Sequence, residues 1–385
     1  MIYRPIGRTG MSASIIGLGA EHLDNRPYEQ CEEVIDAALE ADMNIIDVFM
    51  PGTVVRDHLS KALKGRRDKV LIQGHIGSVD IREQYDRTRD VPTCRKYFEN
   101  LMKSFKTDYI DLGMMFYIDS EEDFQGIFDT EYINYVQQLK KDGTIRAIGF
   151  SSHNPEMAKK VIETGVPEMM MFSINAAYDM LPADFDLETA MGIIGDPKKD
   201  DTYLKGINPA RTELYKLCES KGVAITTMKT LGAGKLVLPD YSPFEKQLTV
   251  GQCIHYALTR PAVVSTLIGC KSCKEVEEAV RYLTLTDEEK DFTDSIKSYK
   301  GDFAGECVYC NHCLPCPASI DIAAMTKLMD IALLNPKNIP SDIRAQYEAS
   351  SHKASDCIEC GNCVARCPFN VSVIENMRRV TELFA

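Results

Sequence analysis

Two short runs near the C-terminal end of the chain hold eight of its fourteen cysteines. The runs read Cys307-x2-Cys310-x2-Cys313-x2-Cys316 and Cys357-x2-Cys360-x2-Cys363-x3-Cys367, and a proline follows the last cysteine of each. Thiolates in tetrahedral sulfur sites select iron–sulfur clusters or zinc over harder metals. Runs of four cysteines closed by Cys-Pro favour two [4Fe-4S] clusters, because zinc ribbons use cysteine pairs that are separated by longer gaps.

The same pattern predicts which cysteines share a cluster. In two-cluster ferredoxins the fourth cysteine of each run binds the cluster of the other run. We therefore expect one cluster on Cys307, Cys310, Cys313 and Cys367 and the other on Cys357, Cys360, Cys363 and Cys316. Two structural zinc sites are the alternative.

Length and composition set the broad class of the protein. A chain of 385 residues exceeds the size at which one core usually stops growing, so we expect a large domain at residues 1–284 and a smaller cluster-binding domain at residues 285–385. Its 44% hydrophobic and 26% charged residues are ordinary for a globular protein. The net charge of −13 argues against nucleic acid or an anionic membrane surface as a partner.

The sequence also predicts the cellular compartment. No stretch approaches the roughly 18 apolar residues that a membrane-spanning helix needs, and the N-terminus lacks the apolar core of a signal peptide. Cluster thiolates need reducing surroundings, and the six other cysteines show no disulfide-like spacing. We therefore expect a cytoplasmic protein from an anaerobic or strongly reducing host.

Short apolar runs alternate with helical patterns over the larger domain. The runs cover residues 14–20, 44–47, 70–74, 109–116, 147–151, 169–175, 224–228 and 265–269. Eight strand–helix units predict a closed (β/α)8 TIM barrel. A doubly wound open sheet is the alternative, but Gly17-Leu18-Gly19 is not followed by the third glycine of its phosphate-binding motif. Between the two cysteine runs, a helical stretch at residues 322–334 predicts a ferredoxin-like domain with a helical insertion.

Several local sequences resemble the aldo/keto reductase family. They are Gly7-Arg8-Thr9-Gly10, Ile16-Gly17-Leu18-Gly19, Asn44-Ile45-Ile46-Asp47, Asp108-Tyr109-Ile110-Asp111-Leu112 and Arg146-Ala147-Ile148-Gly149-Phe150-Ser151-Ser152-His153. The family branch that carries a C-terminal ferredoxin domain is also similar at residues 228–234 and 310–317. This resemblance covers nearly the whole chain and implies a (β/α)8 barrel with its active site at the C-terminal ends of the strands.

The chain departs from this family where the chemistry is expected. Aldo/keto reductases transfer a hydride from a nicotinamide with an Asp, a proton-donating Tyr, a Lys and a His, and only the Asp is kept, as Asp47. The Tyr position falls in Met50-Pro51-Gly52, the Lys aligns with His75, and the His aligns with Phe116. Protonation of the alkoxide contributes about 10²- to 10⁴-fold to the rate, and Met and Phe do not supply that proton.

Other residues at the strand ends are candidates for this role. His75 beside Asp47 and Tyr117 are the leading acid–base candidates, because an ordinary imidazole titrates near neutral pH, and His22 is a further one. Each also has a structural interpretation: His75 as a neutral hydrogen-bonded residue, Tyr117 as a packing aromatic and His22 as a solvent-facing loop residue. We expect His153 to be structural.

The nicotinamide site implied by the resemblance is only partly present. The family holds the carboxamide with a Ser-Asn pair and a Gln, and these positions are Ser151-Ser152 and Met171 here. Together with Asn175 and Lys229, the two serines are the expected cofactor-binding residues at the barrel mouth.

A second half of that site is expected after the last strand. Lys271 and Ser272 at a helix start would suit a 2′-phosphate, and a capped helix with an exposed lysine is the alternative. NADP(H) therefore stays open as a cofactor, and a flavin has no clear motif. The long segment from Asp179 to Ala210 predicts a lid over the mouth, and a solvated excursion is the alternative.

These observations favour a redox enzyme whose two clusters deliver electrons to a small organic substrate at the mouth of the barrel, with a ferredoxin or flavodoxin as the expected donor. Clusters move single electrons whereas a hydride carries two, so nicotinamide and clusters exchange poorly without a mediator. The alternatives are an NADP-dependent reductase with a rearranged tetrad, a non-redox lyase or isomerase using His75 and Tyr117, and an electron-transfer scaffold. A mouth filled by Met50, Phe116 and Met171 would favour the scaffold.

Overall fold

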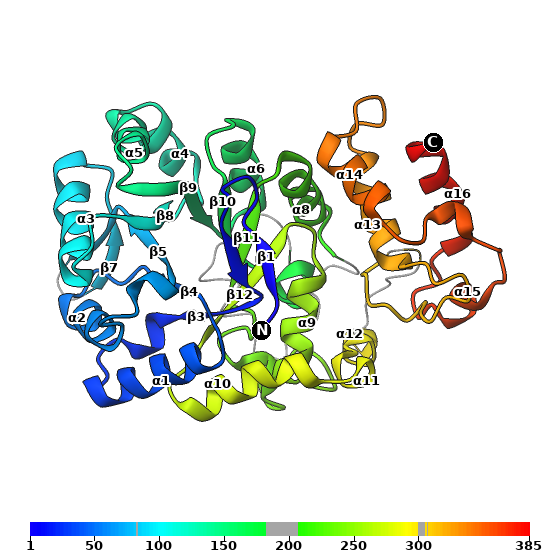
Figure 1. Ribbon diagram of the computed structural model, residues 1–385, viewed down its shortest axis with the longest axis horizontal. Helices are drawn as coiled ribbons and strands as arrows, with labels where there is room; N and C mark the ends of the chain where they lie inside the picture. The colour runs from blue at the N-terminus through cyan, green and yellow to red at the C-terminus, as the bar shows by residue number, and fades with distance from the viewer. Residues whose placement is uncertain (82–83, 182–206, 299–304, 306) are drawn as a thin grey trace.

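Eight parallel strands form a closed barrel in the computed structural model, which describes residues 1–81, 84–181, 207–298, 305 and 307–385 (Figure 1). In barrel order the strands are β3 (Ile16–Gly19), β4 (Ile45–Val48), β5 (Leu71–Ile76), β8 (Ile110–Met115), β9 (Ile145–Ser152), β10 (Met169–Ser173), β11 (Ala224–Met228) and β12 (Val263–Gly269), which pairs with β3. Each predicted apolar run overlaps one of these strands. The predicted TIM barrel is confirmed, and the open-sheet alternative is wrong.

Helices surround the barrel because their apolar residues recur at three- and four-residue steps. The surrounding helices are α1 (Tyr28–Glu40), α2 (Thr53–Ala62), α3 (Val91–Phe105), α4 (Glu121–Phe128), α5 (Glu131–Lys141), α6 (Pro155–Glu163), α8 (Pro209–Lys221), α9 (Val250–Thr259) and α10 (Cys273–Val280). In α5, for example, Tyr132, Val136 and Leu139 are buried, and Gly143 just beyond the helix has a φ of +76°.

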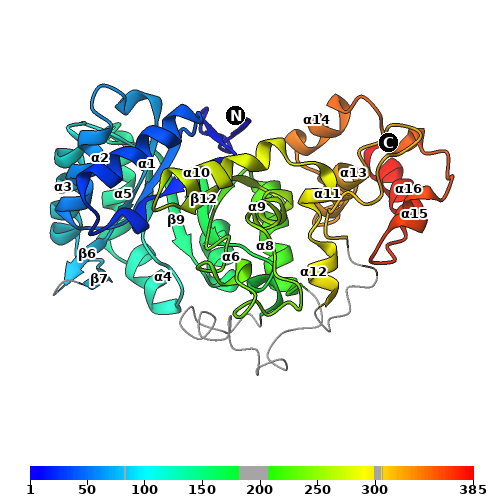
Figure 2. The same cartoon turned by 90° about the horizontal axis from the view of Figure 1, so that it is seen from below.

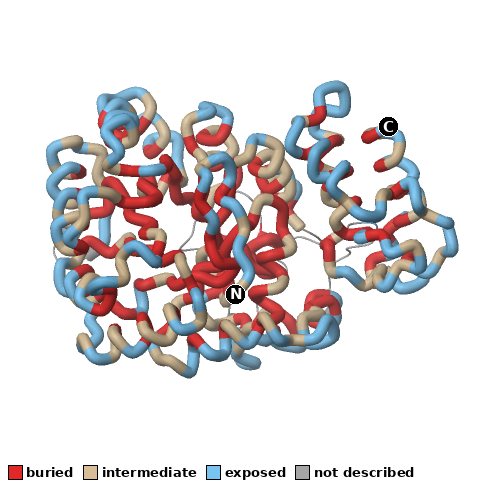
Figure 3. The backbone as a smooth tube through the Cα atoms, viewed as in Figure 1, coloured by how far each residue is buried: buried red, intermediate tan, exposed pale blue. Residues whose placement is uncertain are grey.

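The interior of the barrel is filled by apolar side chains from all around the sheet. Methionines contribute much of this packing, with Met114 on β8 and Met169 and Met171 on β10. Gly113 permits the close approach of β8 and β9, because a Cβ atom there would lie 2.7 Å from Cγ2 of Ile145. Figure 3 shows the buried residues concentrated along the strands and the inner faces of the helices. The barrel is therefore a packed core, and an active site is expected at the C-terminal ends of its strands.

Two antiparallel hairpins flank the barrel. Strands β1 (Tyr3–Pro5) and β2 (Ser12–Ser14) precede it, and strands β6 (Ser78–Ile81) and β7 (Gln84–Arg87) follow β5 at the mouth. Short 3-10 helices are η1 (Ala20–Leu23), η2 (Arg67–Lys69), η3 (Tyr178–Met180), η5 (Lys235–Val237) and η6 (Arg281–Thr284). Most of the predicted lid, residues 182–206, lies outside the described residues. Its two ends are joined, since the Asn208 backbone N–H donates to the Asp179 carbonyl at 2.6 Å.

The C-terminal region is helical and lies against one flank of the barrel (Figure 2). Its helices are α11 (Asp287–Lys290), α12 (Thr293–Ser298), α13 (Ile322–Ala332), α14 (Ser341–Ala349), η7 (Ala354–Asp356), α15 (Asn362–Arg366) and α16 (Val373–Phe384). Helix α13 is the predicted insertion, and it packs on α16 and on barrel helix α8. The predicted domain boundary at residue 285 stays a prediction; residues beyond it still contact the barrel, since Phe292 packs on Tyr256 of α9 with ring centroids 5.2 Å apart.

No helix among the described residues is long and apolar enough to cross a membrane.

Candidate functional site

A buried histidine–aspartate pair lies at the C-terminal ends of β4 and β5. Asp47 pairs in register with Gln73, and His75 lies two residues further along β5, so both β5 side chains face the same side of the strand. Nε2 of His75 lies 2.8 Å from Oδ1 of Asp47, and the Gln73 amide donates to the same oxygen at 2.6 Å. Both side chains of the pair are nearly inaccessible to solvent. The sequence predicted that His75 lies beside Asp47, and the structure shows this contact.

This geometry fixes the state of the imidazole. A carboxylate facing Nε2 holds the proton on that nitrogen, which leaves the lone pair on Nδ1. In the described part of the chain, the buried Nδ1 atom of His75 has no hydrogen-bond partner. The imidazole is thus oriented by Asp47 on one side and keeps a basic nitrogen on the other.

Two phenylalanines enclose the imidazole. The Phe116 ring meets it edge-on with centroids 5.4 Å apart, and the Phe49 ring lies 6.1 Å away. The two phenylalanine rings stack on each other at 5.9 Å. Phe116, which the resemblance aligns with the family histidine, thus forms an apolar wall beside His75.

A polar network continues below the histidine pair. The Gln73 side-chain carbonyl accepts a hydrogen bond from the Thr226 hydroxyl on β11 at 3.0 Å, and its amide also lies 3.0 Å from the Met171 sulfur. Met50 and Met171 are buried. The interior therefore combines a hydrogen-bonded polar core with the apolar side chains that were expected of a scaffold.

A second histidine–aspartate pair, which the sequence did not predict, joins the loops after β8 and β9. Nδ1 of His153 lies 2.8 Å from Oδ2 of Asp119, whose other oxygen accepts from the His153 backbone N–H and the Ser152 hydroxyl. The His153 Nε2 atom is buried without a hydrogen-bond partner among the described residues. His153 directly follows β9, whereas Asp119 lies in the loop between β8 and α4, so no motif in the sequence joins the two residues.

The charges of this second pair follow from its burial. Burial lowers the pKa of His153, and the opposing Asp119 charge does not restore it. Burial by itself raises the pKa of Asp119, but the charge and hydrogen bonds of His153 outweigh it and bring the pKa below its ordinary value. At neutral pH the pair therefore holds an ionised aspartate and a neutral imidazole.

Tyr117 belongs to the His153 side of the mouth. Its ring centroid lies 5.2 Å from that of His153, and the Arg87 guanidinium carbon lies 4.7 Å from the tyrosine ring. Its backbone has a φ of +56°, and its N–H donates to the Ser151 hydroxyl at 2.8 Å. Burial, followed by the Asp119 charge, raises the pKa of Tyr117 to about 12. The phenol therefore keeps its proton at neutral pH.

The expected cofactor residues at the mouth are held by protein contacts. The Ser152 hydroxyl donates to Asp119 at 2.9 Å, and the Asn175 amide donates to the Lys229 carbonyl at 2.9 Å. Lys229 has a φ of +57°, and burial lowers the pKa of its ammonium group while the charges of Glu21 and Asp119 oppose this. Their role toward a cofactor stays a prediction.

The remaining predicted residues lie on the β3–β12 side. His22 is exposed on η1 and packs on Gly269, where a Cβ atom would lie 2.8 Å from its Nε2. At the start of α10, the Ser272 hydroxyl caps the helix by accepting from the Glu275 N–H, and the Lys271 N–H donates to the Glu275 carboxylate at 2.6 Å. Glu275 thus accepts the backbone N–H that a 2′-phosphate would use. These contacts are those of a capped helix, the alternative interpretation of Lys271 and Ser272.

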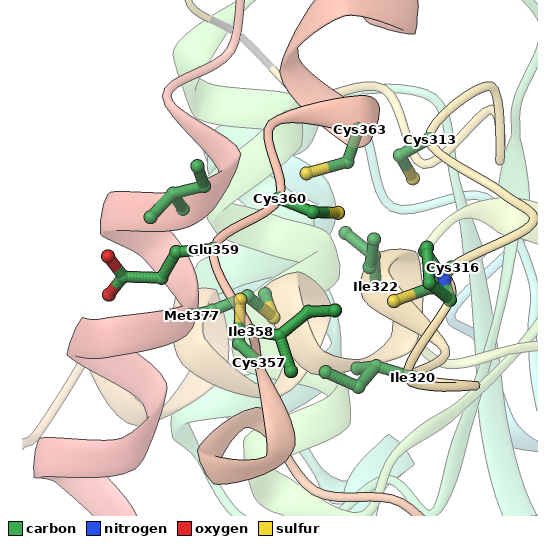
Figure 4. A pocket seen from close by; sticks show the side chains of 12 residues that line it. Cys313, Cys316, Ile320, Ile322, Cys357, Ile358, Glu359, Cys360, Cys363 and Met377 are labelled. Atoms are coloured by element: carbon green, nitrogen blue, oxygen red, sulfur yellow. The ribbon is translucent and has the colours of Figure 1, made fainter.

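The cysteines of the two runs converge in the C-terminal region (Figure 4). One pocket is lined by Cys313 and Cys316 of the first run and by Cys357, Cys360 and Cys363 of the second. Ile320, Ile322, Ile358 and Met377 supply an apolar wall, and the Glu359 side chain points away. Thiols gathered in a largely apolar pocket suit an iron–sulfur cluster by donor chemistry.

The other four cysteines are also near one another. The pKa of the Cys310 thiol is raised first by burial and also by a charge on Cys367, and a charge on Cys310 acts in the same way on Cys307. Within the described residues, no three Cys, His, Asp or Glu side chains surround one point as the ligands of a single ion do. In a [4Fe-4S] cluster each thiolate binds its own iron. The division into two ligand sets stays a prediction.

Two family models match the chain. Residues 15–250 match the model of the aldo/keto reductase family, and residues 306–372 match a 4Fe-4S dicluster domain. The uncharacterized oxidoreductase YqkF of Bacillus subtilis is 24% identical over 301 residues, which cover 74% of this chain and 93% of YqkF. The L-galactose dehydrogenase of Arabidopsis thaliana is 24% identical over 310 residues, covering 73% of this chain and 88% of that enzyme.

Solved structures share the barrel. The holo form of the aldo-keto reductase AKR11C1 from Bacillus halodurans superposes with a TM-score of 0.59 at 20% identity, covering 78% of this chain and 96% of that one. A putative aldo-keto reductase from Pseudomonas aeruginosa, PA4992, gives a TM-score of 0.54 at 19% identity, covering 73% and 95%. At this identity the likeness concerns the fold.

Proposed function

The chain belongs to the aldo/keto reductase family and ends in a 4Fe-4S dicluster domain, and from these premises we propose that it reduces a small organic substrate at the barrel mouth with electrons that arrive through two [4Fe-4S] clusters. An oxidoreductase of this family is the established part. The substrate, the electron route and the catalytic residues are the proposal.

The single observation that carries the proposal is the state of His75. Its Nε2 is fixed by Asp47, its Nδ1 is buried without a partner in the described structure, and phenylalanines enclose it. A molecule bound at the mouth can therefore exchange a hydrogen bond and a proton with Nδ1, while Asp47 orients the ring from the other side. His75 thereby donates the proton that the side chains of Met50 and Phe116 do not supply.

The reaction requires a defined balance of electrons and protons. Two equivalents of an external one-electron carrier are oxidised, and the substrate takes up two electrons and two protons. When bound, the clusters supply these electrons one at a time. His75 gives one proton from Nδ1 and is reprotonated from solvent, and the second proton comes from water at the mouth. The cysteines would hold the clusters, and the buried side chains of Ile320, Ile322 and Met377 line the site of one of them.

An NADP(H)-dependent reduction is the second candidate. It is favoured by the family and by Tyr117, whose phenol keeps its proton at neutral pH because burial raises its pKa to about 12. Against it stands Glu275, whose carboxylate accepts the Lys271 N–H, one of the amides that a 2′-phosphate at this helix start would use. In this case Tyr117 and His153, rather than His75, would be the residues nearest to the transferred proton.

The test compares electron donors on anaerobically purified protein. Reduced methyl viologen and NADPH are each supplied with a panel of aldehydes, ketones and unsaturated acids. We expect viologen-driven turnover at least tenfold faster than NADPH-driven turnover, and we expect His75→Gln to lower it by about 10²-fold or more without loss of iron. His352→Gln, at an exposed histidine of the C-terminal region, is the matched control and should keep the activity. Rapid NADPH-linked turnover that His75→Gln leaves unchanged would overturn the proposal.

A further inference from the structure

A buried arginine joins the barrel to the first cysteine run. Arg260 directly follows α9, is almost wholly buried, and donates from Nη2 to the carbonyl of Val308, the residue next to Cys307. Its Nε donates to the Tyr256 carbonyl at 3.3 Å. The guanidinium carbon lies 4.5 Å from the Tyr256 ring centroid and 5.5 Å from that of Tyr309. The cation is therefore held firmly beside Cys307.

The charge of Arg260 has no protein counter-ion in the described structure. Its acceptors are the carbonyls of Val308 and Tyr256 and the hydroxyl of Thr259, all of them neutral. Burying an unpaired guanidinium is costly, because the group stays protonated in proteins. A cluster bound by four thiolates carries net negative charge and would lie next to this cation. Arg260 is thus explained as a counter-charge for the cluster on Cys307.

A lysine strengthens the positive field on the same side. Lys327 of α13 lies with Nζ 5.6 Å from the Tyr309 ring centroid, and burial lowers its pKa to about 8 while the charges of Glu219 and Asp321 oppose this. On the acidic side, Asp330 accepts from the Tyr309 hydroxyl at 2.6 Å and lies 3.6 Å from Lys216. Burial raises the pKa of the Cys307 thiol most, the Asp330 charge raises it further, and the Arg260 charge opposes both. Arg260 is thus the cation that acts on Cys307 against this carboxylate.

The pocket of the other cysteine set has a different environment. The described residues that line it include no Lys or Arg, and the charged side chain among them, Glu359, forms an exposed ion pair with Arg378 at 2.6 Å. Nearby net charge, hydrogen bonds and exposure set the reduction potential of a cluster. A buried cation favours the reduced form, which carries one more negative charge, and in low dielectric this effect is weakly screened.

We propose that Arg260, supported by Lys327, makes the cluster at Cys307 the higher-potential cluster of the two. Electrons then run from the cluster at Cys360 to the cluster at Cys307, which is the one beside barrel helix α9. This direction rests on the proposed function, whereas the order of the potentials does not. Helix α9 also reaches the barrel mouth, since the Tyr256 hydroxyl donates to Asp179 at 2.7 Å and the Asp179 N–H donates to the carbonyl of Asn175.

The test is a redox titration of the anaerobic holoprotein, followed by the paramagnetic signals of the two reduced clusters. We expect Arg260→Gln to lower the potential of one cluster and to leave that of the other in place, which serves as the internal reference. Arg260→Lys should keep most of the wild-type value because it keeps the charge. Arg95→Gln, at the exposed ion pair with Glu99 on barrel helix α3, should shift neither potential measurably.

Two further measurements make the result decisive. If Arg260→Gln loses iron, Lys327→Gln gives the second reading and should lower the same cluster by a smaller amount. Equal shifts of both clusters, or no shift in either variant, would overturn the assignment. The titration uses no substrate, so potentials in the proposed order without any turnover would contradict the proposed function and leave the role of Arg260 standing.

Discussion

At the scale of single residues, the barrel mouth contains two imidazoles that are prepared in the same way. In each, a carboxylate fixes one ring nitrogen and the other nitrogen is buried without a described partner: Nδ1 of His75 and Nε2 of His153. Unsatisfied buried polar atoms are costly in a stable fold, so they mark places where a bound molecule completes the hydrogen bonds. The phenylalanines around His75 add exclusion of water, and for that reason we place the proton donor there.

The cysteines give a residue-scale prediction. Because eight thiolates form two cubane sites, wild-type protein should contain about eight iron atoms per chain. Cys360→Ala should bring the content to about four or fewer, since one site loses a ligand. Iron and acid-labile sulfide analysis measures this, with Cys273→Ala as a control outside both runs. Unchanged iron in Cys360→Ala, or stoichiometric zinc in the wild type, would contradict the cluster assignment.

At the scale of elements, helix α9 connects the two regions of the chain. A capping box of Thr249 and Gln252 begins it, and the Gln252 amide donates to the Asp291 carbonyl just before α12. Tyr256 reaches Asp179, and Arg260 at its end reaches Val308. Most of the helix is buried, as expected of a helix that packs on the barrel on one side and on the C-terminal region on the other.

His255 of α9 should make stability depend on pH. Burial, together with the charges of Lys290 and Arg260, lowers its pKa to about 4, and Asp287 and Asp291 oppose this only in part. As pH falls below about 6.5, His255 becomes protonated in the unfolded chain, whereas in the folded protein it stays neutral down to about pH 4. His255 therefore does not lower the stability of the fold above pH 6.5, and the free energy of unfolding decreases as pH falls from about 6.5 to about 4.

Between pH 7 and pH 5 the loss attributable to His255 should be about 2 kcal/mol, or less where the site opens to solvent. Urea unfolding of the wild type and of His255→Gln at both pH values measures it, and the variant should lose less stability on acidification. His352→Gln, at an exposed histidine, is the control and should behave like the wild type. Parallel losses in the wild type and His255→Gln would refute the assignment.

At the scale of the whole molecule, polar contacts join the C-terminal region to the barrel along its flank. Lys216 of α8 lies 3.6 Å from Asp330 of α13, and Nε2 of His312 in the first cysteine run lies 3.1 Å from Asp291. These contacts place the Cys307 side of the cluster region against the barrel and leave the second run on the outer side (Figure 2). The arrangement suits electrons that enter from outside and leave toward the barrel.

Removal of iron should therefore affect the two regions differently. Metal binding contributes directly to the folding of small metal-binding domains, whereas the barrel has its own core. After anaerobic chelation, backbone amides in α13, α15 and α16 should exchange much faster, and amides of strands β3, β4 and β5 should keep their protection. Hydrogen exchange with mass spectrometry measures both in one sample. Equal loss of protection in the barrel strands would show that the two regions fold as one unit.

The sequence by itself determined the features that are local along the chain. Cysteine spacing within each run predicted the clusters, and the alternation of apolar runs with helical patterns predicted the eight-stranded barrel, because both depend on residues a few positions apart. The pairing of His75 with Asp47 was also predictable, since residues at the ends of adjacent parallel strands lie together.

Tertiary structure alone decided which atoms meet across long separations in the chain. Asp119 and His153 are 34 residues apart, and Arg260 and Val308 are 48 apart, with no shared motif. The same holds for the choice of ring nitrogen at His75 and for the Glu275 carboxylate at the expected phosphate site. Such features depend on side-chain orientation and on burial, which raises the cost of an unpaired charge, and neither is specified by spacing along the chain.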